Sequence, residues 1–137
     1  MTTEQTTLGT GETLQEFFTR FGGGDRKGVL ELFTDGTDWN VPGAANVPWT
    51  GRRSTPAEID AFLENCYELV TTEAFAVDQV IVDGENAIAL GSFTHLVKAT
   101  GKRFVSDYAL HVRVVDGVIR TYHMFEDSHA ASEAFTA

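Results

Sequence analysis

The second half of the chain carries three turn signals, each set between runs of β-branched and aromatic residues. They are "VDGEN" at residues 82–86, "ATGKR" at residues 99–103 and "VVDGVI" at residues 114–119. A short glycine-containing turn between such runs is typical of a β-hairpin, in which neighbouring strands run antiparallel. The sequence therefore predicts four long antiparallel strands, near residues 72–83, 86–98, 103–115 and 118–127.

The first half of the chain shows helical periodicity instead. Apolar residues from Leu14 to Phe21 recur at helical spacing and stop at "GGG", where glycine suits the end of a helix. Start signals for two further helices follow at Asp25 and at "STPAE", where Ser54 or Thr55 is the cap. The remaining predicted elements are a short strand over residues 38–41 and a final short helix capped by Ser128.

These elements predict an α+β fold. Three helices lying on a strongly curved antiparallel sheet form a cone, and such a cone encloses a pocket. A chain of 137 residues fits one domain with one core. We therefore expect a loose N-terminal tail over residues 1–10 and a single domain over residues 11–137.

Charge and composition narrow the range of partners. The formal net charge is −10, from 20 acidic and 10 basic residues, and lysine and arginine do not cluster. Nucleic acid and membranes are therefore not expected as partners. The sequence holds no apolar run of membrane-spanning length, and its one cysteine, Cys66, cannot form an internal bridge. These features predict a soluble protein of the reducing cytoplasm.

The segment "RTYHMFEDSHA", residues 120–130, raises the question of a metal site. Its histidines and carboxylates are metal ligands by type, but an extended strand would separate His123 from Asp127 by about 13 Å. That distance is too long for both side chains to bind one ion. No metal site is therefore predicted, and the histidines are interpreted as surface or interface residues.

Five stretches of the chain follow one another in an informative order: "FFTRFGGGD", "LELFTDGTDWNVPG", "PWTGR", "ATGKRF" and "VRVVDGVIRTYHMFEDS". Together they resemble the SnoaL-like branch of the nuclear transport factor 2-like superfamily, over roughly residues 12–135. The resemblance implies the cone fold with its pocket. The superfamily includes ketosteroid isomerase, limonene epoxide hydrolase, scytalone dehydratase and polyketide cyclases, but also binding and transport modules, so function has to be argued from the site.

The last predicted hairpin decides which residues share a face of the sheet. If residues 115–117 form a three-residue loop, Leu110 lies opposite Tyr122 and Tyr108 lies opposite Met124. The resemblance implies that Leu110, Tyr122 and Met124 face the cavity. We therefore expect these tyrosines and their neighbours to line a pocket.

His111, His123 and Phe125 then fall on the outer face of the sheet. Apolar residues accompany them there, which a face turned only to solvent would not need. Members of the superfamily commonly pair through this face. A two-fold homodimer through the outer sheet face is therefore expected.

The resemblance does not bring the known catalytic sets into this chain. The three catalytic positions of ketosteroid isomerase correspond to Phe17, Leu110 and either Asn40 or Val41, and none has the matching residue type. Of the four positions in limonene epoxide hydrolase, only the asparagine that holds the water is matched, by Asn40. The reactions of these two enzymes are therefore not expected.

The expected pocket keeps a few hydrogen-bonding groups. Hydroxyl and amide groups can polarise a carbonyl, and an imidazole can transfer a proton near neutral pH. The candidate catalytic residues are Asn40, His95, Tyr108 and Tyr122. The candidate ligand-binding residues are Phe17, Trp39, Trp49, Phe62, Leu110, Met124 and, at the rim, Glu126.

This set of residues predicts a cofactor-free isomerase, dehydratase or cyclase that uses acid–base chemistry on a small lipophilic carbonyl compound. The alternative is a non-catalytic module of the same shape that binds a hydrophobic small molecule. The aromatic pocket with Asn40 favours the enzyme, whereas the missing carboxylates favour the binding module.

Overall fold

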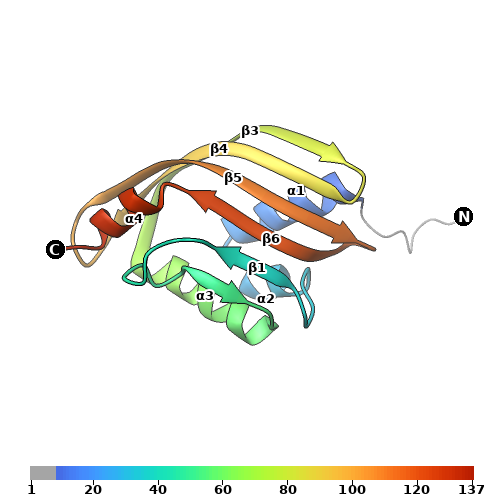
Figure 1. Cartoon of the computed structure of the whole chain (residues 1–137), viewed down its shortest axis with the longest axis horizontal. Helices are drawn as coiled ribbons and strands as arrows, with labels where there is room; N and C mark the ends of the chain where they lie inside the picture. Colours follow the sequence, from blue (N-terminus) through green and yellow to red (C-terminus); the bar gives the residue numbers. More distant parts are fainter. Residues whose placement is uncertain (1–8) are drawn as a thin grey trace, which may run out of the picture.

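The computed structural model describes residues 9–137. Within these residues the chain forms an α+β fold with four helices and one six-stranded curved sheet in the order β2-β1-β6-β5-β4-β3 (Figure 1). The strands are β1 (Asp38–Val41), β2 (Gly51–Arg53), β3 (Val70–Asp83), β4 (Asn86–Val97), β5 (Arg103–Val115) and β6 (Val118–Glu126). The helices are α1 (Thr10–Gly22), α2 (Arg26–Leu30), α3 (Pro56–Leu69) and α4 (Ser128–Ala134). The predicted fold class and its long antiparallel strands are confirmed.

Residues 1–8 of the expected N-terminal tail lie outside the described residues. Gly9 and Thr10 are described, and Thr10 is the first residue of α1. The hydroxyl of Thr10 donates a hydrogen bond to the carbonyl of Gly84, 2.7 Å away in the β3–β4 turn. This bond ties the start of α1 to the sheet.

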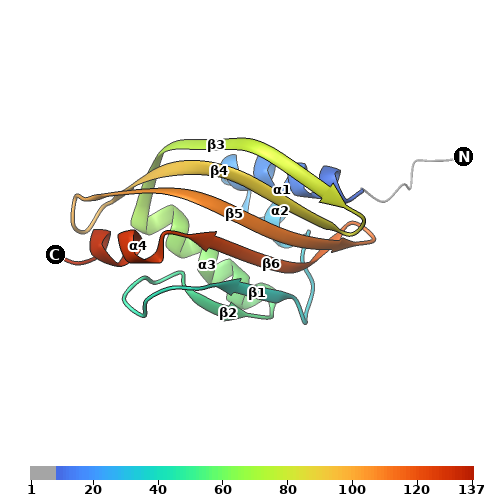
Figure 2. The same cartoon turned by 45° about the horizontal axis from the view of Figure 1, so that its top comes forward.

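Helices α1, α2 and α3 lie on one face of the sheet, and the long strands bend over them (Figure 2). The start of α3 is the predicted capping box, with Thr55 as the cap. Its hydroxyl accepts a hydrogen bond from the backbone N–H of Glu58 at 3.2 Å, and the Glu58 carboxylate accepts from the N–H of Thr55 at 3.2 Å. These bonds satisfy backbone donors that a helix start leaves free.

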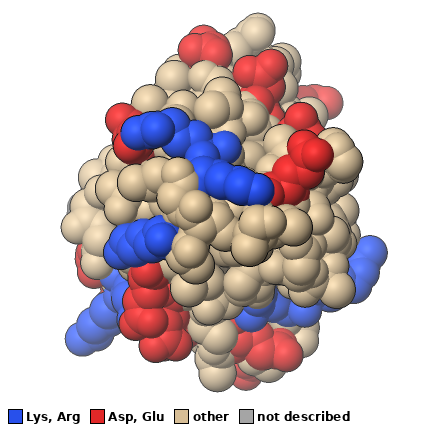
Figure 3. Space-filling model, turned by 90° about the vertical axis from the view of Figure 1, so that its left-hand side faces the viewer, with Lys and Arg blue, Asp and Glu red and all other residues tan. Residues whose placement is uncertain are grey.

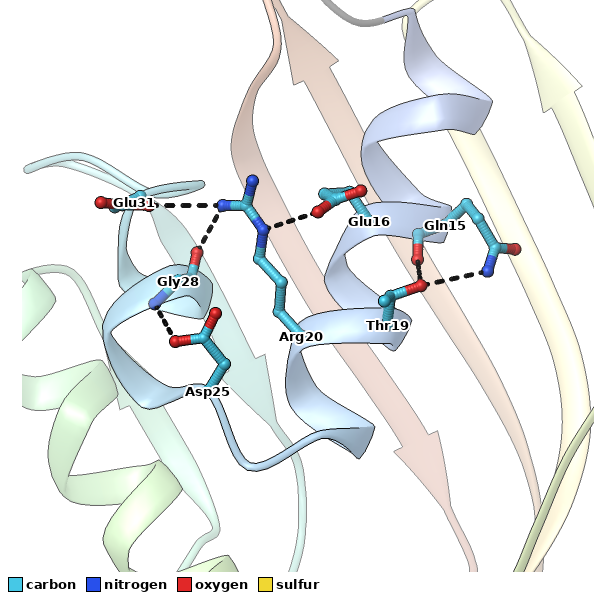
Figure 4. A network of polar contacts seen from close by, with 7 residues as sticks. All are labelled: Gln15, Glu16, Thr19, Arg20, Asp25, Gly28 and Glu31. Atoms are coloured by element: carbon cyan, nitrogen blue, oxygen red, sulfur yellow. Dashed lines mark hydrogen bonds and ion pairs between the residues drawn. The ribbon is translucent and has the colours of Figure 1, made fainter.

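A polar network fixes α2 against the last turn of α1 (Figure 4). The Arg20 guanidinium donates to Glu16 at 2.8 Å and to the carbonyl of Gly28 at 2.7 Å, and it lies 3.6 Å from the Glu31 carboxylate. Asp25 caps α2 as predicted, by accepting from the N–H of Gly28 at 2.9 Å. The network holds the aromatic face of α1 toward the sheet.

Two local features differ from the predictions. Strand β2 was not predicted, because its three residues, Gly51 to Arg53, show no alternation of apolar and polar side chains. Helix α4 is capped by Asp127 rather than by Ser128, since the Asp127 carboxylate accepts from the N–H of Ala130 at 2.9 Å. Neither feature changes the fold class.

The β5–β6 hairpin has a different register from the predicted one. Asp116 and Gly117 both have positive φ, 52° and 75°, so the loop has two residues and Val115 pairs with Val118. After an irregularity at Arg113, Leu110 lies opposite Met124 rather than Tyr122. The predicted and observed pairings of Leu110 differ by two residues, which keeps the side chains from Tyr108 to Arg113 and their partners on the predicted faces. Nearer the turn the pairing is shifted by one residue, so Val114 pairs with the buried Ile119 rather than with Val118, and the predicted faces are exchanged there.

Gly91 allows the close approach of β3 and β4 beneath Tyr108. A Cβ atom here would clash with the carbonyl of Ala76 and lie 2.7 Å from the Tyr108 hydroxyl, which donates to that same carbonyl at 2.9 Å. We expect Gly91→Ala to lower the free energy of unfolding by about 3 kcal/mol, at the upper end of typical overpacking costs. Urea unfolding measures the change. Gly22→Ala is the control, because a Cβ at Gly22 has no neighbour within 4 Å, and equal losses in both variants would contradict the expectation.

Acidic and basic residues are interspersed on the end of the molecule that carries α4 (Figure 3). Lysine and arginine lie beside aspartate and glutamate on this face, and much of the surface between them is uncharged. This face therefore presents no continuous basic patch.

Candidate functional site

A largely apolar cavity of about 420 Å³ lies between the helices and the inner face of the sheet. Helices α1 and α3 supply one wall, and strands β3, β4 and β6 supply the other. Aromatic rings dominate both walls. The aromatic lining residues are Phe17, Phe18, Phe21, Trp49, Phe62, Tyr67, Phe75, Phe93, His95 and Tyr122.

Glu126 is the one carboxylate that lines this cavity among the described residues. The indole N–H of Trp49 donates to its Oε2 atom at 2.9 Å. Burial raises the pKa of Glu126 to about 7, and the hydrogen bond from Trp49 opposes that rise. The carboxyl group is therefore near half-protonation at neutral pH, where a side chain can both take and give a proton.

Glu126 was expected at the rim of the pocket, and in the structure it lines the cavity while staying partly exposed. Trp49, from the loop between β1 and β2, covers the end of β6, and the Phe135 ring packs on Trp49 with 5.2 Å between centroids. Strand periodicity does not reveal this contact, because Trp49 comes from a loop and Phe135 from the C-terminal end of the chain.

His95 lines the cavity from β4. Its ring stacks on Phe93, with centroids 4.4 Å apart, and its Nδ1 atom lies 3.0 Å from the Thr72 hydroxyl. Burial lowers the pKa of His95 to about 4, so the imidazole is neutral at pH 7. A neutral imidazole can donate or accept a hydrogen bond inside the cavity, but it carries no charge there.

Tyr122 is a buried lining residue whose hydroxyl has no hydrogen-bond partner within residues 9–137. Burial raises its pKa well above the ordinary value, so the hydroxyl stays protonated and can donate to a ligand. Cys66 also lines the cavity, and burial raises the pKa of its thiol. The thiol is therefore an apolar wall group rather than a thiolate nucleophile.

Residues 14–122 match the sequence profile of the SnoaL-like domain. This stretch is most of the chain and contains α3, most of α1 and most of the sheet. The chain belongs to the SnoaL-like family. The cavity described above is therefore the pocket of a SnoaL-like domain.

Solved structures of similar shape support this assignment. An NTF2-like protein from Burkholderia xenovorans LB400 is 24% identical, with a TM-score of 0.85 over 96% of this chain and 98% of that one. Another NTF2-like protein, from Burkholderia thailandensis E264, is 19% identical, with a TM-score of 0.84 over 95% and 99%. TerC, co-crystallised with polyporic acid, is 18% identical, with a TM-score of 0.80 over 93% and 98%. At these identities the likeness shows the fold. No curated protein matches the chain.

Seven of the eleven predicted site residues of this SnoaL-like chain line the cavity. They belong to both the proposed catalytic and the proposed ligand-binding groups. They are Phe17, Trp49, Phe62, His95, Tyr122, Met124 and Glu126. Their placement is observed, whereas their roles remain predictions.

The other four predicted site residues do not line the cavity. Asn40 lies between the buried Trp39 and Val41 on β1 and pairs with His123, so strand alternation turns it to the opposite face. Trp39 lies behind Tyr122, stacked at 3.8 Å. Leu110 and Tyr108 point inward but belong to the buried core. The Tyr108 hydroxyl already donates a hydrogen bond to the backbone carbonyl of Ala76.

Several lining residues of the SnoaL-like pocket were missed from the sequence. Phe93 lies two positions before His95 on β4, so strand alternation alone could have placed the two together. Phe75 is opposite Phe93 on β3 and could have followed from the first hairpin. Tyr67 has no such signal, because its hydroxyl reaches the carbonyl of Phe21 on a different helix, at 2.6 Å.

Two further properties bear on the kind of site. Across residues 9–137, no group of three or more His, Cys, Asp and Glu side chains is arranged to hold a metal ion. None of the helices in this range has the length and apolar character needed to reach across a bilayer.

Proposed function

We propose that this SnoaL-like protein is a cofactor-free enzyme that transfers protons on a small lipophilic carbonyl compound, as an isomerase, dehydratase or cyclase. The observation that carries the proposal is the Glu126 carboxyl group, which has a pKa of about 7 inside an apolar cavity. A group titrating near the working pH is the most effective general acid or base. The aromatic walls favour a lipophilic ligand over a charged one.

In the proposed reaction, the Glu126 carboxylate removes a proton from the carbon next to the carbonyl. The electron pair of the broken C–H bond moves onto the carbonyl oxygen, to which the protonated Tyr122 hydroxyl donates a hydrogen bond. The protonated Glu126 then returns the proton, either to another carbon or to a leaving hydroxyl group. The neutral His95 contributes a second hydrogen-bonding group in the cavity.

The alternative is a binding module that holds the same class of compound without reacting with it. It is favoured by the positions of Asn40 and Tyr108, two expected catalytic residues that lie outside the lining. TerC, of similar fold, was co-crystallised with polyporic acid, which supports a small organic ligand for a pocket of this shape. The two functions share a ligand class and differ in proton transfer.

Exchange of carbon-bound hydrogen distinguishes these two functions. Native mass spectrometry of the protein purified from its own host identifies a retained ligand, and related lipophilic ketones are then incubated with the protein in D₂O. We expect deuterium to enter the α-carbon faster with the protein than without it. A compound that binds in the cavity but exchanges at the uncatalysed rate would establish the binding module.

We also propose a homodimer through the outer sheet face, working in the cytoplasm, where a free thiol such as that of Cys66 stays reduced. Exposed apolar side chains spread over β3, β4, β5 and β6 on this face support the dimer, because water contact with such a surface is unfavourable. They are Ile81 (48% exposed), Ile88 (39%), Val105 (61%) and Phe125 (50%).

We expect Val105→Glu to convert the dimer to a monomer, since it would place a charge within the apolar surface that the dimer buries. Val82→Glu is the matched control, because Val82 is 50% exposed but pairs with Ala87, whose side chain is buried on the inner face. Sedimentation velocity at one protein concentration measures the oligomeric state. A monomeric parent, or a Val105→Glu variant as dimeric as the parent, would refute the proposal.

A further inference from the structure

A hydrogen bond between Thr72 and His95 lies in the sheet wall of the apolar cavity, and both residues line the cavity. They are direct partners in the β3–β4 pairing, so the Thr72 hydroxyl lies beside the imidazole ring. The ring stacks on Phe93 and has Phe104 at a centroid distance of 6.2 Å. These contacts direct one ring nitrogen, Nδ1, toward Thr72 and leave the other, Nε2, for a ligand.

The Nε2 atom of His95 has no hydrogen-bond partner within residues 9–137, and it is not sealed inside the protein. In that range the fully buried side-chain nitrogens and oxygens without a partner belong to Trp39, Arg53 and His123. A ligand in the cavity can therefore reach Nε2. Because the imidazole is neutral at pH 7, it carries one hydrogen, and the position of that hydrogen makes Nε2 either a donor or an acceptor.

The Thr72 hydroxyl distinguishes these two tautomers. Its contact with Nδ1 of His95, at 3.0 Å, is the one hydrogen bond that this hydroxyl makes within the described residues. If the hydroxyl donates to Nδ1, its hydrogen has an acceptor, and Nε2 carries the hydrogen of the neutral ring. If Nδ1 donated to the hydroxyl instead, the hydroxyl hydrogen would have no acceptor among the described residues. The first arrangement therefore satisfies both groups.

His95 and Tyr122 face different parts of the cavity. Strands β4 and β6 are the two neighbours of β5, which runs from Arg103 to Val115. His95 lies opposite Phe104, near the start of β5, whereas Tyr122 lies opposite Val112, near its end. One ligand oxygen therefore cannot accept hydrogen bonds from both side chains.

We propose that Thr72 is a positioning residue, which holds His95 in the Nε2–H tautomer so that His95 donates to a second oxygen of the ligand. This role rests on the proposed function, in which Tyr122 donates to the reacting carbonyl. It names the class of ligand as a lipophilic compound with two separate acceptor oxygens. A hydrogen-bond donor of the ligand would find no acceptor at Nε2, so His95 also selects against such a group.

The first test follows the imidazole nitrogens of the full-length protein, without ligand, by long-range ¹H–¹⁵N NMR at pH 7.5. Protonated and unprotonated nitrogens of a neutral imidazole have clearly different ¹⁵N shifts. The protein has four histidines, and His95→Gln assigns the signals of His95. We expect the hydrogen on Nε2 and none on Nδ1. A hydrogen on Nδ1, or an even mixture of the two tautomers, would overturn the proposal.

Thr72→Val keeps the shape of the side chain but removes the hydroxyl. We expect the ¹⁵N shifts of Nδ1 and Nε2 to move toward each other, as the second tautomer becomes populated, and Thr72→Ser to retain the pattern of the parent. Thr71→Val is the matched control, because Thr71 is equally exposed but pairs with Leu96, one position along the strand. Unchanged shifts in Thr72→Val, or equal changes in Thr71→Val, would refute the positioning role. Thermal unfolding monitors folding, and Thr72→Ala replaces Thr72→Val if that variant does not fold.

The second test measures the affinity for two compounds of matched size by isothermal titration calorimetry. 2,6-Diacetylnaphthalene has an acceptor oxygen at each end, whereas 2-acetyl-6-isopropylnaphthalene has one oxygen only. We expect the diacetyl compound to bind about fivefold more tightly, the effect of one neutral hydrogen bond, and His95→Phe to abolish this preference.

Equal affinities in the parent, no binding of either compound, or a preference that persists in His95→Phe would contradict a second oxygen site at His95. Neither test requires turnover. A protein with the expected tautomer and preference that exchanges no hydrogen would therefore disprove catalysis alone, and a catalytic protein without them would disprove the role of Thr72 and His95 alone.

Discussion

Replacing Glu126 by glutamine is expected to stabilise the protein above pH 7 by up to about 3 kcal/mol, and to change its stability little below pH 4.5. The reason is that the pKa of Glu126 is about 7 in the folded protein, against an ordinary value of 4.5. Between these values the folded state holds a proton that the unfolded state releases. The parent therefore loses stability as the pH rises from 4.5 to 7, whereas glutamine has no proton to lose.

The experiment is urea unfolding of the parent and of Glu126→Gln across this pH range. His95 acts in the opposite direction, because its pKa falls from 6.5 to about 4 on folding, so its contribution to stability is lost as the pH drops. That contribution is present in both proteins and cancels in their difference. Glu64→Gln, at an exposed position on α3, is the control. Parallel pH curves for Glu126→Gln and the parent would show that the carboxyl group is not buried.

The same substitution is expected to lower turnover by about 10²–10⁴-fold on a compound that exchanges hydrogen with the parent. Glutamine keeps the size of the side chain and can accept the hydrogen bond from Trp49, but it cannot remove a proton. Binding of the compound should therefore change little while the rate falls. The control Glu64→Gln should retain the activity of the parent.

The dependence of the rate on pH identifies the group responsible. In the parent we expect the rate to rise with pH through a transition near 7, as Glu126 loses its proton. Trp49→Phe removes the hydrogen bond that lowers the pKa of Glu126, so the transition should move to higher pH. Full turnover in Glu126→Gln, or a transition unchanged in Trp49→Phe, would remove Glu126 from the mechanism.

The fold was predictable because its strongest signals are local. The glycine turns at Gly84, Gly101 and Gly117 lie between long strands, and all three have positive φ in the structure. The capping box at Thr55 likewise depends on residues three positions apart. Register was less predictable, because the β5–β6 loop could have two or three residues and the irregularity at Arg113 has no sequence signal of its own.

The candidate site was predictable where it depends on strand alternation and not where it depends on contacts across the fold. Alternation placed Tyr122, Met124 and Glu126 on the inner face correctly. It could not show that Trp49 reaches Glu126 from a loop, since 77 residues separate the two in the sequence. The protonation behaviour of Glu126 follows from that contact and from burial, and so only the assembled fold reveals it.

Strand β1 joins the sheet through a parallel pairing with β6, and this pairing has a consequence for the order in which the protein folds. The hairpins of β3 to β6 connect neighbouring segments, so closing them costs little chain entropy. By contrast, the hydroxyl of Thr37 reaches the carbonyl of Ile119 across 82 residues. Contacts of such long range form slowly, so we expect the hairpins to form first and β1 to dock last. Because Val41 and Trp49 arrive with β1 and the loop that follows it, the cavity is completed only in the final step of folding.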